Sequence, residues 1–322
     1  AELKRLSSMG VYWTPVTDGE AQIIEIYTPI VANAKAIKLQ IPKISHLIAD
    51  SKSGFSLAKG IGDSGTCNVD VVCRVPTLGT NFTNAKNSVA RMVFTDAGDS
   101  FTCTGTLLAD TDAATQIPYF YTADHCVGDA TTAATLNTYW GFEATACGNG
   151  VSAATTQLTT GADYLYSDGN SDASLLRLKS APPAGVFFAG WNSAALTVGT
   201  AITGIHHPSA DLKKSSLGQV KATLSFQHRV GWTSGTTEGG SSGSALFTPT
   251  GTAGAYQLRG GLYGGEASCA NSGNVSTTAN YDDYSRLDVI FPSISQWLAP
   301  AGGTFQGPTR DNSGVWYVPA ES

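Results

Sequence analysis

The chain has 322 residues, a formal net charge of −6 at pH 7 and only 14% charged residues. This length is enough for two domains, or for one large β domain with appendages. The negative balance and the lack of a basic stripe argue against nucleic acid as a partner. No run of roughly 18 apolar residues occurs, so no membrane-spanning helix is expected.

The first 59 residues differ in composition from the rest. Six lysines lie there, against five in the remaining 263 residues, and the segment has no cysteine. Strand-like alternation occurs at residues 21–27 and 34–41, but the segment is too small to bury a generous core alone. It ends in the polar, Gly/Ser-containing stretch SKSGFSLAKGIGDSG, so we place a domain boundary close to Lys59–Gly60.

From Cys67 to about Pro300, short apolar or alternating runs are separated by Gly, Asn, Asp and Pro turns. Examples are VARMVF (89–94), PYFYTA (118–123), SLLRLK (174–179) and YQLRGGLYG (256–264). This pattern, in a chain rich in glycine and poor in Glu and Lys, favours an all-β sandwich or barrel.

One longer helix is expected within residues 286–298. Pro292 suggests that it begins at FPSISQWL, with proline at an early helical position. The tail, residues 301–322, is rich in Gly and Pro and is expected to leave the domain.

The six cysteines predict three disulfides, which is typical of a secreted domain, and sequence alone leaves fifteen pairings open. No CxxC or paired Cys/His spacing is present, so neither zinc nor another metal or cofactor is expected. His206 and His207 are adjacent and therefore point in different directions along a strand, which favours a structural role.

The stretch GGSSGS contains three serines in four positions, Ser241, Ser242 and Ser244. A serine nucleophile needs a base, and the base needs an orienting group. His125, in YFYTADHCVG, follows an apolar strand and neighbours Cys126, and Cys103 is the natural mate of that cysteine. Asp172, in GNSDASLLRLK, directly precedes a buried-looking strand and is the candidate acid.

Three of these stretches, TADHC, DASLL and GGSSGSAL, resemble in that order the TAAHC, DIALL and GDSGGP motifs of chymotrypsin-like serine proteases. The closer resemblance is to the bacterial lysyl endopeptidases of the protease I and protease IV types, which Gram-negative bacteria secrete. The shared segments are GTCNVDVVC, CTGTLL, PPAGVFFAGW, IHHP, EGGSSGS and LRGGLYGG, and they span roughly residues 65 to 298.

The resemblance implies a double six-stranded antiparallel β-barrel with a C-terminal helix. It also implies that His125 is the general base, Asp172 its orienting partner and Ser242 the nucleophile. The backbone N–H groups of Gly240 and Ser242 would form the oxyanion hole.

Ser241 stands where pancreatic-type enzymes carry an Asp that pairs with a freed N-terminus, so that activation switch is expected to be absent. Ser244 stands where those enzymes have a second glycine. The disulfide pairs that the resemblance implies are Cys67–Cys269, Cys73–Cys147 and Cys103–Cys126.

Asp282, in ANYDDYSRL, matches the aspartate at the base of the family's primary specificity pocket, with Asp283 as the competing assignment. Gly264 and Gly265 would line the pocket entrance. The protease I type has a histidine paired with a tryptophan beside the triad, where this chain has Tyr263. Because of this departure, it stays open whether His125 has an additional stacking partner. At this position the chain resembles the protease IV type.

The implied function is a secreted, monomeric serine endopeptidase that cuts protein or peptide substrates on the carboxyl side of lysine. Arginine or mixed preference is the alternative within the enzyme class, and a non-catalytic binding module is the alternative outside it. Residues 1–59 would then be the C-terminal part of a propeptide that the enzyme cuts after Lys59, leaving Gly60 first. The alternatives are a permanent accessory strand unit or a latent zymogen whose cleft this segment covers.

Other side chains near these motifs are expected to be structural. Glu238 and Glu266 are interpreted as loop charges, and Trp140, Trp191 and Trp232 as core residues.

Overall fold

A computed structural model of the chain describes residues 23–25, 41, 44, 60–112, 116–249, 255–300 and 310–311. Lys59 and nearly all of the leading segment lie outside these residues, so the propeptide hypothesis stays a prediction. Within the described ranges, none of the helices is both long and apolar enough to cross a membrane.

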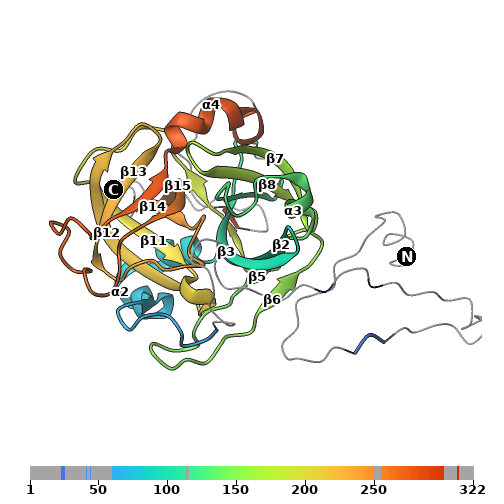
Figure 1. Ribbon diagram of the computed structural model, residues 1–322, viewed down its shortest axis with the longest axis horizontal. Helices are drawn as coiled ribbons and strands as arrows, with labels where there is room; N and C mark the ends of the chain where they lie inside the picture. The colour runs from blue at the N-terminus through green and yellow to red at the C-terminus, as the bar shows by residue number, and fades with distance from the viewer. Residues whose placement is uncertain are drawn as a thin grey trace, which may run out of the picture.

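Six antiparallel strands close into a barrel, the C-terminal barrel (Figure 1, yellow to orange). Its strands pair in the order β12-β11-β14-β15-β16-β13, and pairing of β12 with β13 closes the ring. The short strands β1 and β10 add to β12 and β15. The bounds are β1 Val69–Asp70, β10 Gly190–Trp191, β11 Ala201–His206, β12 Lys214–Thr223, β13 Gln227–Ser234, β14 Ala245–Pro249, β15 Tyr256–Gly265 and β16 Asp282–Ser285.

The N-terminal sheet lies beside this barrel (Figure 1, green). Within the described residues it joins seven antiparallel strands in the order β6-β5-β2-β3-β4-β8-β7. The bounds are β2 Val89–Asp96, β3 Asp99–Leu108, β4 Tyr119–Thr122, β5 Asn137–Trp140, β6 Thr156–Leu158, β7 Ala162–Asp168 and β8 Ala173–Leu178. A closed six-stranded barrel, a second antiparallel sheet and a C-terminal helix confirm the predicted fold class.

Three apolar clusters form the core, and one of them joins the two bodies. One lies inside the N-terminal sheet around Met92 and Phe120, and one inside the C-terminal barrel around Trp232. The third mixes side chains of both bodies, such as Tyr121 and Phe247, with the C-terminal helix. Trp140, Trp191 and Trp232 are all buried, as expected. The two sheets therefore share a core, and the groups at their junction are held in fixed relation.

The C-terminal helix α4 spans Leu287–Leu298 and packs on β7 of one body and β15 of the other. The expected start at FPSISQWL is wrong, because the helix begins four residues earlier, where the N–H of Ile290 donates to the carbonyl of Arg286 at 3.3 Å. Pro292 is therefore internal, and the helix tolerates it because one apolar face stays buried. That face consists of Leu287, Ile290, Ile294 and Leu298.

A second long helix, α2 (Val71–Lys86), was not expected. Pro76 and Gly79 lower its intrinsic helix propensity, and Gly79 kinks it with a φ of 73°. Burial of Val71, Phe82 and Ala85 stabilises it instead, so tertiary packing overrides the local sequence. Two short helices follow, α3 (Ala130–Ala134) and the 3₁₀ helix η2 (Pro208–Ala210).

The tail does not simply leave the domain. Its strand β17 (Arg310–Asp311) pairs antiparallel with β9 (Phe187–Phe188), so the backbone returns to the body at this point. An edge strand leaves its N–H and C=O groups unpaired, and a passing segment can satisfy them whatever its side chains are.

Candidate active site

His125 and Asp172 meet because two neighbouring strands bring them to the same edge of the N-terminal sheet. Strand β4 runs up to Thr122 and pairs antiparallel with β8, with Thr122 opposite Ser174. Residues just after β4 therefore lie beside residues just before β8. One oxygen of Asp172 lies 2.7 Å from His125 Nδ1, and the other accepts the His125 backbone N–H at 2.9 Å.

This contact fixes which ring nitrogen of His125 can act as a base. A carboxylate only accepts hydrogen bonds, so Nδ1 carries the proton and the neutral ring has its lone pair on Nε2. Nε2 is buried and has no hydrogen-bond partner among the described residues. Asp172 adopts a φ of 57°, a left-handed conformation that Asp tolerates better than most residues.

The disulfide Cys103–Cys126 fastens the loop that carries His125 to strand β3. The structure also joins Cys67 to Cys269 and Cys73 to Cys147, which are the pairs that the resemblance implies. Cys103, His125 and Cys126 offer ligand atoms within 4.8 Å of one another. Since the two sulfurs are bonded to each other, they are not available to a metal.

Ser242 lies in the loop between β13 and β14, half-buried, and bridges the two bodies through its backbone. Its carbonyl accepts the N–H of Thr104, next to the disulfide, at 2.9 Å. The following residue, Gly243, has a φ of 77°. A Cβ there would lie 2.7 Å from the backbone nitrogen of Ala123, two residues before His125. Glycine is thus required where this loop approaches the His125 loop.

No hydrogen bond joins His125 to Ser242 within the described residues. Such nucleophile–base bonds are commonly long in ligand-free enzymes and tighten when substrate binds. Hydrogen bonds and a disulfide nevertheless hold His125, Asp172 and the Ser242 loop close together.

In the loop that carries Ser242, two backbone carbonyls point toward the protein interior, and their orientation sets the direction of the N–H groups of Gly240 and Ser242. The carbonyl of Gly239 accepts the Ser209 N–H at 2.6 Å, and the carbonyl of Ser241 accepts the Ser244 N–H at 3.0 Å. In a trans peptide the C=O and N–H point in opposite directions. The N–H groups of Gly240 and Ser242 therefore point outward, as an oxyanion hole requires.

Ser241 and His206 form a buried hydrogen-bond chain behind the nucleophile. The Ser216 hydroxyl donates to the carbonyl of Thr236 at 2.7 Å, so it accepts from Nε2 of His206 at 3.1 Å. Nδ1 of His206 then accepts from the Ser241 hydroxyl at 2.9 Å. Burial lowers the pKa of His206 to about 3, so the ring is neutral and each group in the chain has one role.

His207 points elsewhere, with Nδ1 at 3.1 Å from the carbonyl of Asp211 and its ring stacked on Phe142. The two adjacent histidines thus contact different partners, and each contact is structural.

Asp282 is buried at the end of β16, inside the C-terminal barrel. One oxygen accepts from Trp232 Nε1 at 2.6 Å and from the Thr237 hydroxyl at 2.7 Å. The other oxygen faces Gly265, where a Cβ would lie 2.5 Å from it. Burial raises the pKa of Asp282 to about 6, although hydrogen bonds from Trp232 and Thr237 oppose the shift.

Asp283 points to the opposite face of the strand, as alternation requires. Arg229 holds both of its oxygens, at 2.9 and 2.8 Å. Of the two candidates, only Asp282 has a carboxylate that is buried and not neutralised by a protein cation among the described residues.

Tyr263 and Gly264 continue β15 toward His125. Tyr263 is exposed, and its ring meets the imidazole edge-on, with centroids 6.3 Å apart and planes at 87°. An aromatic contact on His125 therefore exists, but as an edge rather than a stack. Gly264 has a φ of 143° and open space at its Cβ position.

Sequence reasoning missed several side chains that touch this site. Trp232 was assigned only to the core, Thr237 was not singled out, and Glu238 was taken for a loop charge. Their contacts join residues 45 to 173 positions apart. No local motif could have indicated them.

The comparisons with known proteins agree on one family. Residues 61–285 match the family described as lysyl endopeptidase, C-terminal domain, and residues 4–48 match the lysyl endopeptidase N-terminal domain. The lysyl endopeptidase of Pseudomonas aeruginosa is 39% identical over 308 residues, which is 92% of this chain. The chain spans 65% of the length of that curated relative.

Solved structures that the chain resembles are more distant. Two structures of the HtrA-type protease AlgW with tripeptide have TM-scores of 0.47 and 0.46 and identities of 13% and 14%. They match 70% and 69% of this chain, and 64% and 63% of theirs. By the family match and the identity to its curated relative, the chain belongs to the lysyl endopeptidase family.

Proposed function

We propose that this protein is a serine endopeptidase that hydrolyses the peptide bond on the carboxyl side of lysine. The arrangement of His125, Asp172 and Ser242 supports the chemistry, and the buried carboxylate of Asp282 supports the specificity. Asp282 is the observation that carries the lysine assignment, because a desolvated anion favours a cationic side chain.

The reaction follows from the tautomer of His125. Ser242 Oγ attacks the scissile carbonyl carbon while its proton passes to Nε2, and the carbonyl electrons move to the oxygen. Asp172 stabilises the imidazolium, and the N–H groups of Gly240 and Ser242 stabilise the oxyanion. The intermediate collapses with protonation of the leaving amine by His125, and water then repeats the sequence to release the acid.

The pocket would accept the lysine ammonium at the oxygen of Asp282 that faces Gly265. The Cβ position of Gly264 is open, which leaves room for an extended side chain, whereas a Cβ at Gly265 would clash with Tyr281 and with Asp282 itself. Trp232 and Thr237 hold the other oxygen, so the carboxylate cannot turn to accommodate a planar guanidinium on both oxygens.

Paired substrates test this proposal. Lysyl and arginyl peptide amides of otherwise identical sequence should differ in kcat/KM by at least about a hundredfold in favour of lysine. Comparable rates would contradict lysine specificity and favour a mixed trypsin-like preference.

Two variants separate chemistry from specificity. Ser242→Ala should lower kcat by roughly 10⁶-fold, since it removes the nucleophile. Asp282→Asn should strongly lower kcat/KM for lysyl substrates. It should have little effect on kcat/KM for any slow cleavage after an uncharged side chain. If Ser242→Ala left hydrolysis intact, the mechanism would be wrong.

We further propose that residues 1–59 are a pro-segment removed after Lys59 and that the domain works outside the cell. The uneven lysine distribution and the match of residues 4–48 to a separate N-terminal domain support the first point. Three disulfides support an oxidising compartment. N-terminal sequencing of the active enzyme should give Gly60, whereas an upstream start would favour a permanent accessory segment.

A further inference from the structure

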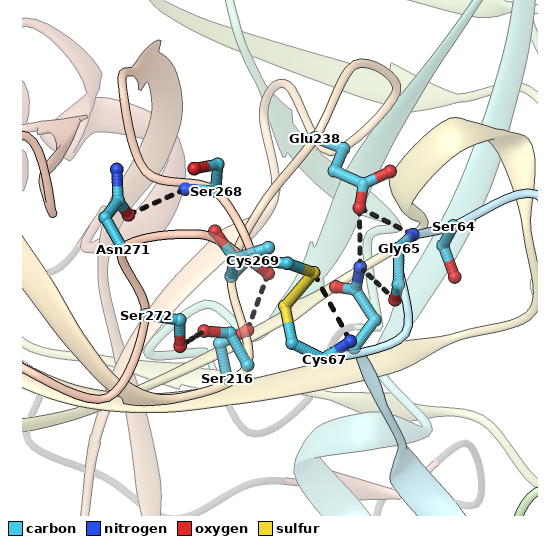
Figure 2. The surroundings of a disulfide bond; sticks show 12 residues. Ser64, Gly65, Cys67, Ser216, Glu238, Ser268, Cys269, Asn271 and Ser272 are labelled. Atoms are coloured by element: carbon cyan, nitrogen blue, oxygen red, sulfur yellow. Dashed lines mark hydrogen bonds between the residues drawn. A yellow bond between two sulfur atoms is a disulfide. The ribbon is translucent and has the colours of Figure 1, made fainter.

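The side chain of Glu238 lies between two segments that are far from it in sequence. One oxygen accepts the Gly65 N–H at 2.8 Å and the Asn68 side-chain amide at 2.7 Å. The other accepts the Ser209 hydroxyl at 2.7 Å. Figure 2 shows the carboxylate directly above Gly65, beside the Cys67–Cys269 disulfide. A carboxylate accepts all three bonds at once, so this is more than a solvated loop charge.

Ser209 belongs to a backbone turn that is strained in isolation. Ser209 and Ala210 have φ values of 52° and 59°, and both are buried. Two consecutive non-glycine residues in the left-handed region persist only where surrounding contacts hold them. Two contacts of Ser209 lead to the same loop: its hydroxyl donates to Glu238, and its N–H donates to the carbonyl of Gly239 at 2.6 Å.

The Ser209–Ala210 turn packs against the Ser242 loop at Gly240. Gly240 has a φ of 91°, and a Cβ there would lie 2.9 Å from the carbonyl of His207 and 3.2 Å from the Ala210 nitrogen. The Ser209 N–H fixes the direction of the Gly239 carbonyl, and through the planar peptide it fixes the Gly240 N–H. If Ser209 moved, that peptide could flip and turn the Gly240 N–H away from substrate.

We propose that Glu238 is a positioning residue for the oxyanion hole, acting through Ser209 and anchored by the segment Gly65–Asn68. The inference rests on the proposed function, since it concerns the same reacting carbonyl. Glu238 touches neither substrate nor reacting atoms. Its role is to hold the turn that sets the Gly240 N–H.

The anchoring segment gives this residue a link to the proposed processing site. Gly62 N–H and the Ser64 hydroxyl donate to Asp211 at 2.9 and 2.5 Å, in the same turn region. Cys67 then ties the segment to Cys269. The first residues after Lys59 are thus held against the turn behind the oxyanion hole by neutral donors. No freed ammonium is required for these contacts.

The test compares two inhibitors in the full chain. A peptidyl lysine aldehyde accepts the Ser242 oxygen at its carbonyl carbon, and its carbonyl oxygen then occupies the oxyanion hole. An alkylammonium such as n-pentylamine fills the lysine pocket only. In Glu238→Ala, kcat should fall about 10- to 100-fold and the inhibition constant of the aldehyde should rise by a similar factor. KM and the inhibition constant of n-pentylamine should stay within about threefold.

Two further variants sharpen the result. Glu238→Gln should stay within about fivefold of wild-type kcat. Its amide oxygen can still accept from Gly65 and Asn68, and its NH₂ group can donate to the Ser209 hydroxyl. Ser209→Ala in the Glu238→Ala background should add little, since both act through one contact. Asp163→Ala removes an exposed acid paired with Arg177 and should leave both inhibition constants unchanged.

The proposal would be overturned by a Glu238→Ala enzyme with kcat within threefold of wild type. Equal weakening of both inhibitors would also overturn it, since that indicates general loss of the pocket. So would a Glu238→Gln enzyme as impaired as Glu238→Ala. Failure of the proposed function looks different: the wild-type chain itself would then neither cleave lysyl substrates nor bind the aldehyde.

Discussion

Asp282 and Asp283 are neighbours with the same functional group, yet they have opposite environments. Alternation along β16 sends one carboxylate into the barrel and the other to Arg229. The buried one loses most of its hydration, which disfavours its charged form and raises its pKa. Burial therefore makes the ionised form of Asp282 costly for the fold, and in the proposed pocket the same burial would favour a cation.

Because burial of the ionised carboxylate is costly, removal of the Asp282 charge should stabilise the fold at a pH where the carboxylate is ionised. With a folded pKa of about 6, above its unfolded value, the folded state binds more protons between about pH 4 and pH 6. The contribution of Asp282 to stability therefore falls as pH rises through that window. Asp282→Asn should raise the free energy of unfolding by on the order of 2 kcal/mol at pH 8, and by little at pH 4. Urea denaturation of both proteins at the two pH values measures this, and a less stable variant at pH 8 would refute it.

His206 should show the opposite pH dependence. Its folded pKa of about 3 lies below its unfolded value, so the unfolded state takes up a proton first and stability is lost as pH falls from about 6.5 toward 3.

A substitution at His206 should also reach the nucleophile loop. His206→Phe leaves the hydroxyls of Ser241 and Ser216 buried without this partner, which should cost about 2–4 kcal/mol of stability. Denaturant unfolding at pH 8 checks the prediction, with His207→Phe as the neighbouring comparison. A change below about 0.5 kcal/mol would show that the chain does not hold the loop.

At the scale of elements, His125, Asp172 and Ser242 each lie just outside a strand, and hydrogen bonds or a disulfide hold the segments that carry them. The β4–β8 register brings His125 to Asp172, and the Cys103–Cys126 disulfide ties the His125 loop to β3. In the same strand, the Thr104 N–H donates a hydrogen bond to the Ser242 carbonyl. Strand β3 thus supports both the His125 loop and the Ser242 loop.

Loss of the Cys103–Cys126 disulfide should therefore affect both stability and rate. Serine at both positions should lower the free energy of unfolding by about 3 kcal/mol, because the bond closes a loop between residues 23 positions apart. It should also lower kcat roughly tenfold or more through displacement of His125. Serine at Cys73 and Cys147 is the control, with a comparable stability loss and near-normal kcat; equal kcat losses would contradict the role of β3.

At the scale of the whole molecule, four of the five lysines that follow residue 59 are held by the fold, and Lys179 is the exposed exception. Lys86 and Lys213 are buried beside Glu143, and Lys214 pairs with Asp70 at 2.6 Å. Lys221 donates to two backbone carbonyls, of Thr277 and Asn280. A protease must take an extended segment into its cleft, and these residues cannot adopt one without local unfolding.

The folded domain should for this reason resist its own activity. During incubation of active enzyme at pH 8, no new N-termini should appear after Lys86, Lys213, Lys214 or Lys221, which the fold holds, whereas the exposed Lys179 lacks this protection. Cleavage after the buried lysines should appear when about 4 M urea is added to expose them. Mass spectrometry of the products follows both, and native cleavage after Lys213 or Lys214 would contradict the prediction.

Short motifs in the sequence were sufficient to predict the fold class and to propose His125, Asp172 and Ser242 as candidate site residues. Those residues lie in short contiguous motifs that can be recognised without the fold. The motifs are an apolar strand, a cysteine beside a histidine, and glycines around a serine. The even cysteine count likewise predicted three disulfides without assigning them.

Tertiary structure alone decided the rest. Helix α2 forms because its apolar face is buried, in spite of Pro76 and Gly79. Asp282 is separated from Asp283 only by the direction each takes from β16. Glu238 gains its role from Gly65 and Ser209, which lie 173 and 29 positions away. Packing sets such contacts between distant segments, and no local pattern of residues encodes them.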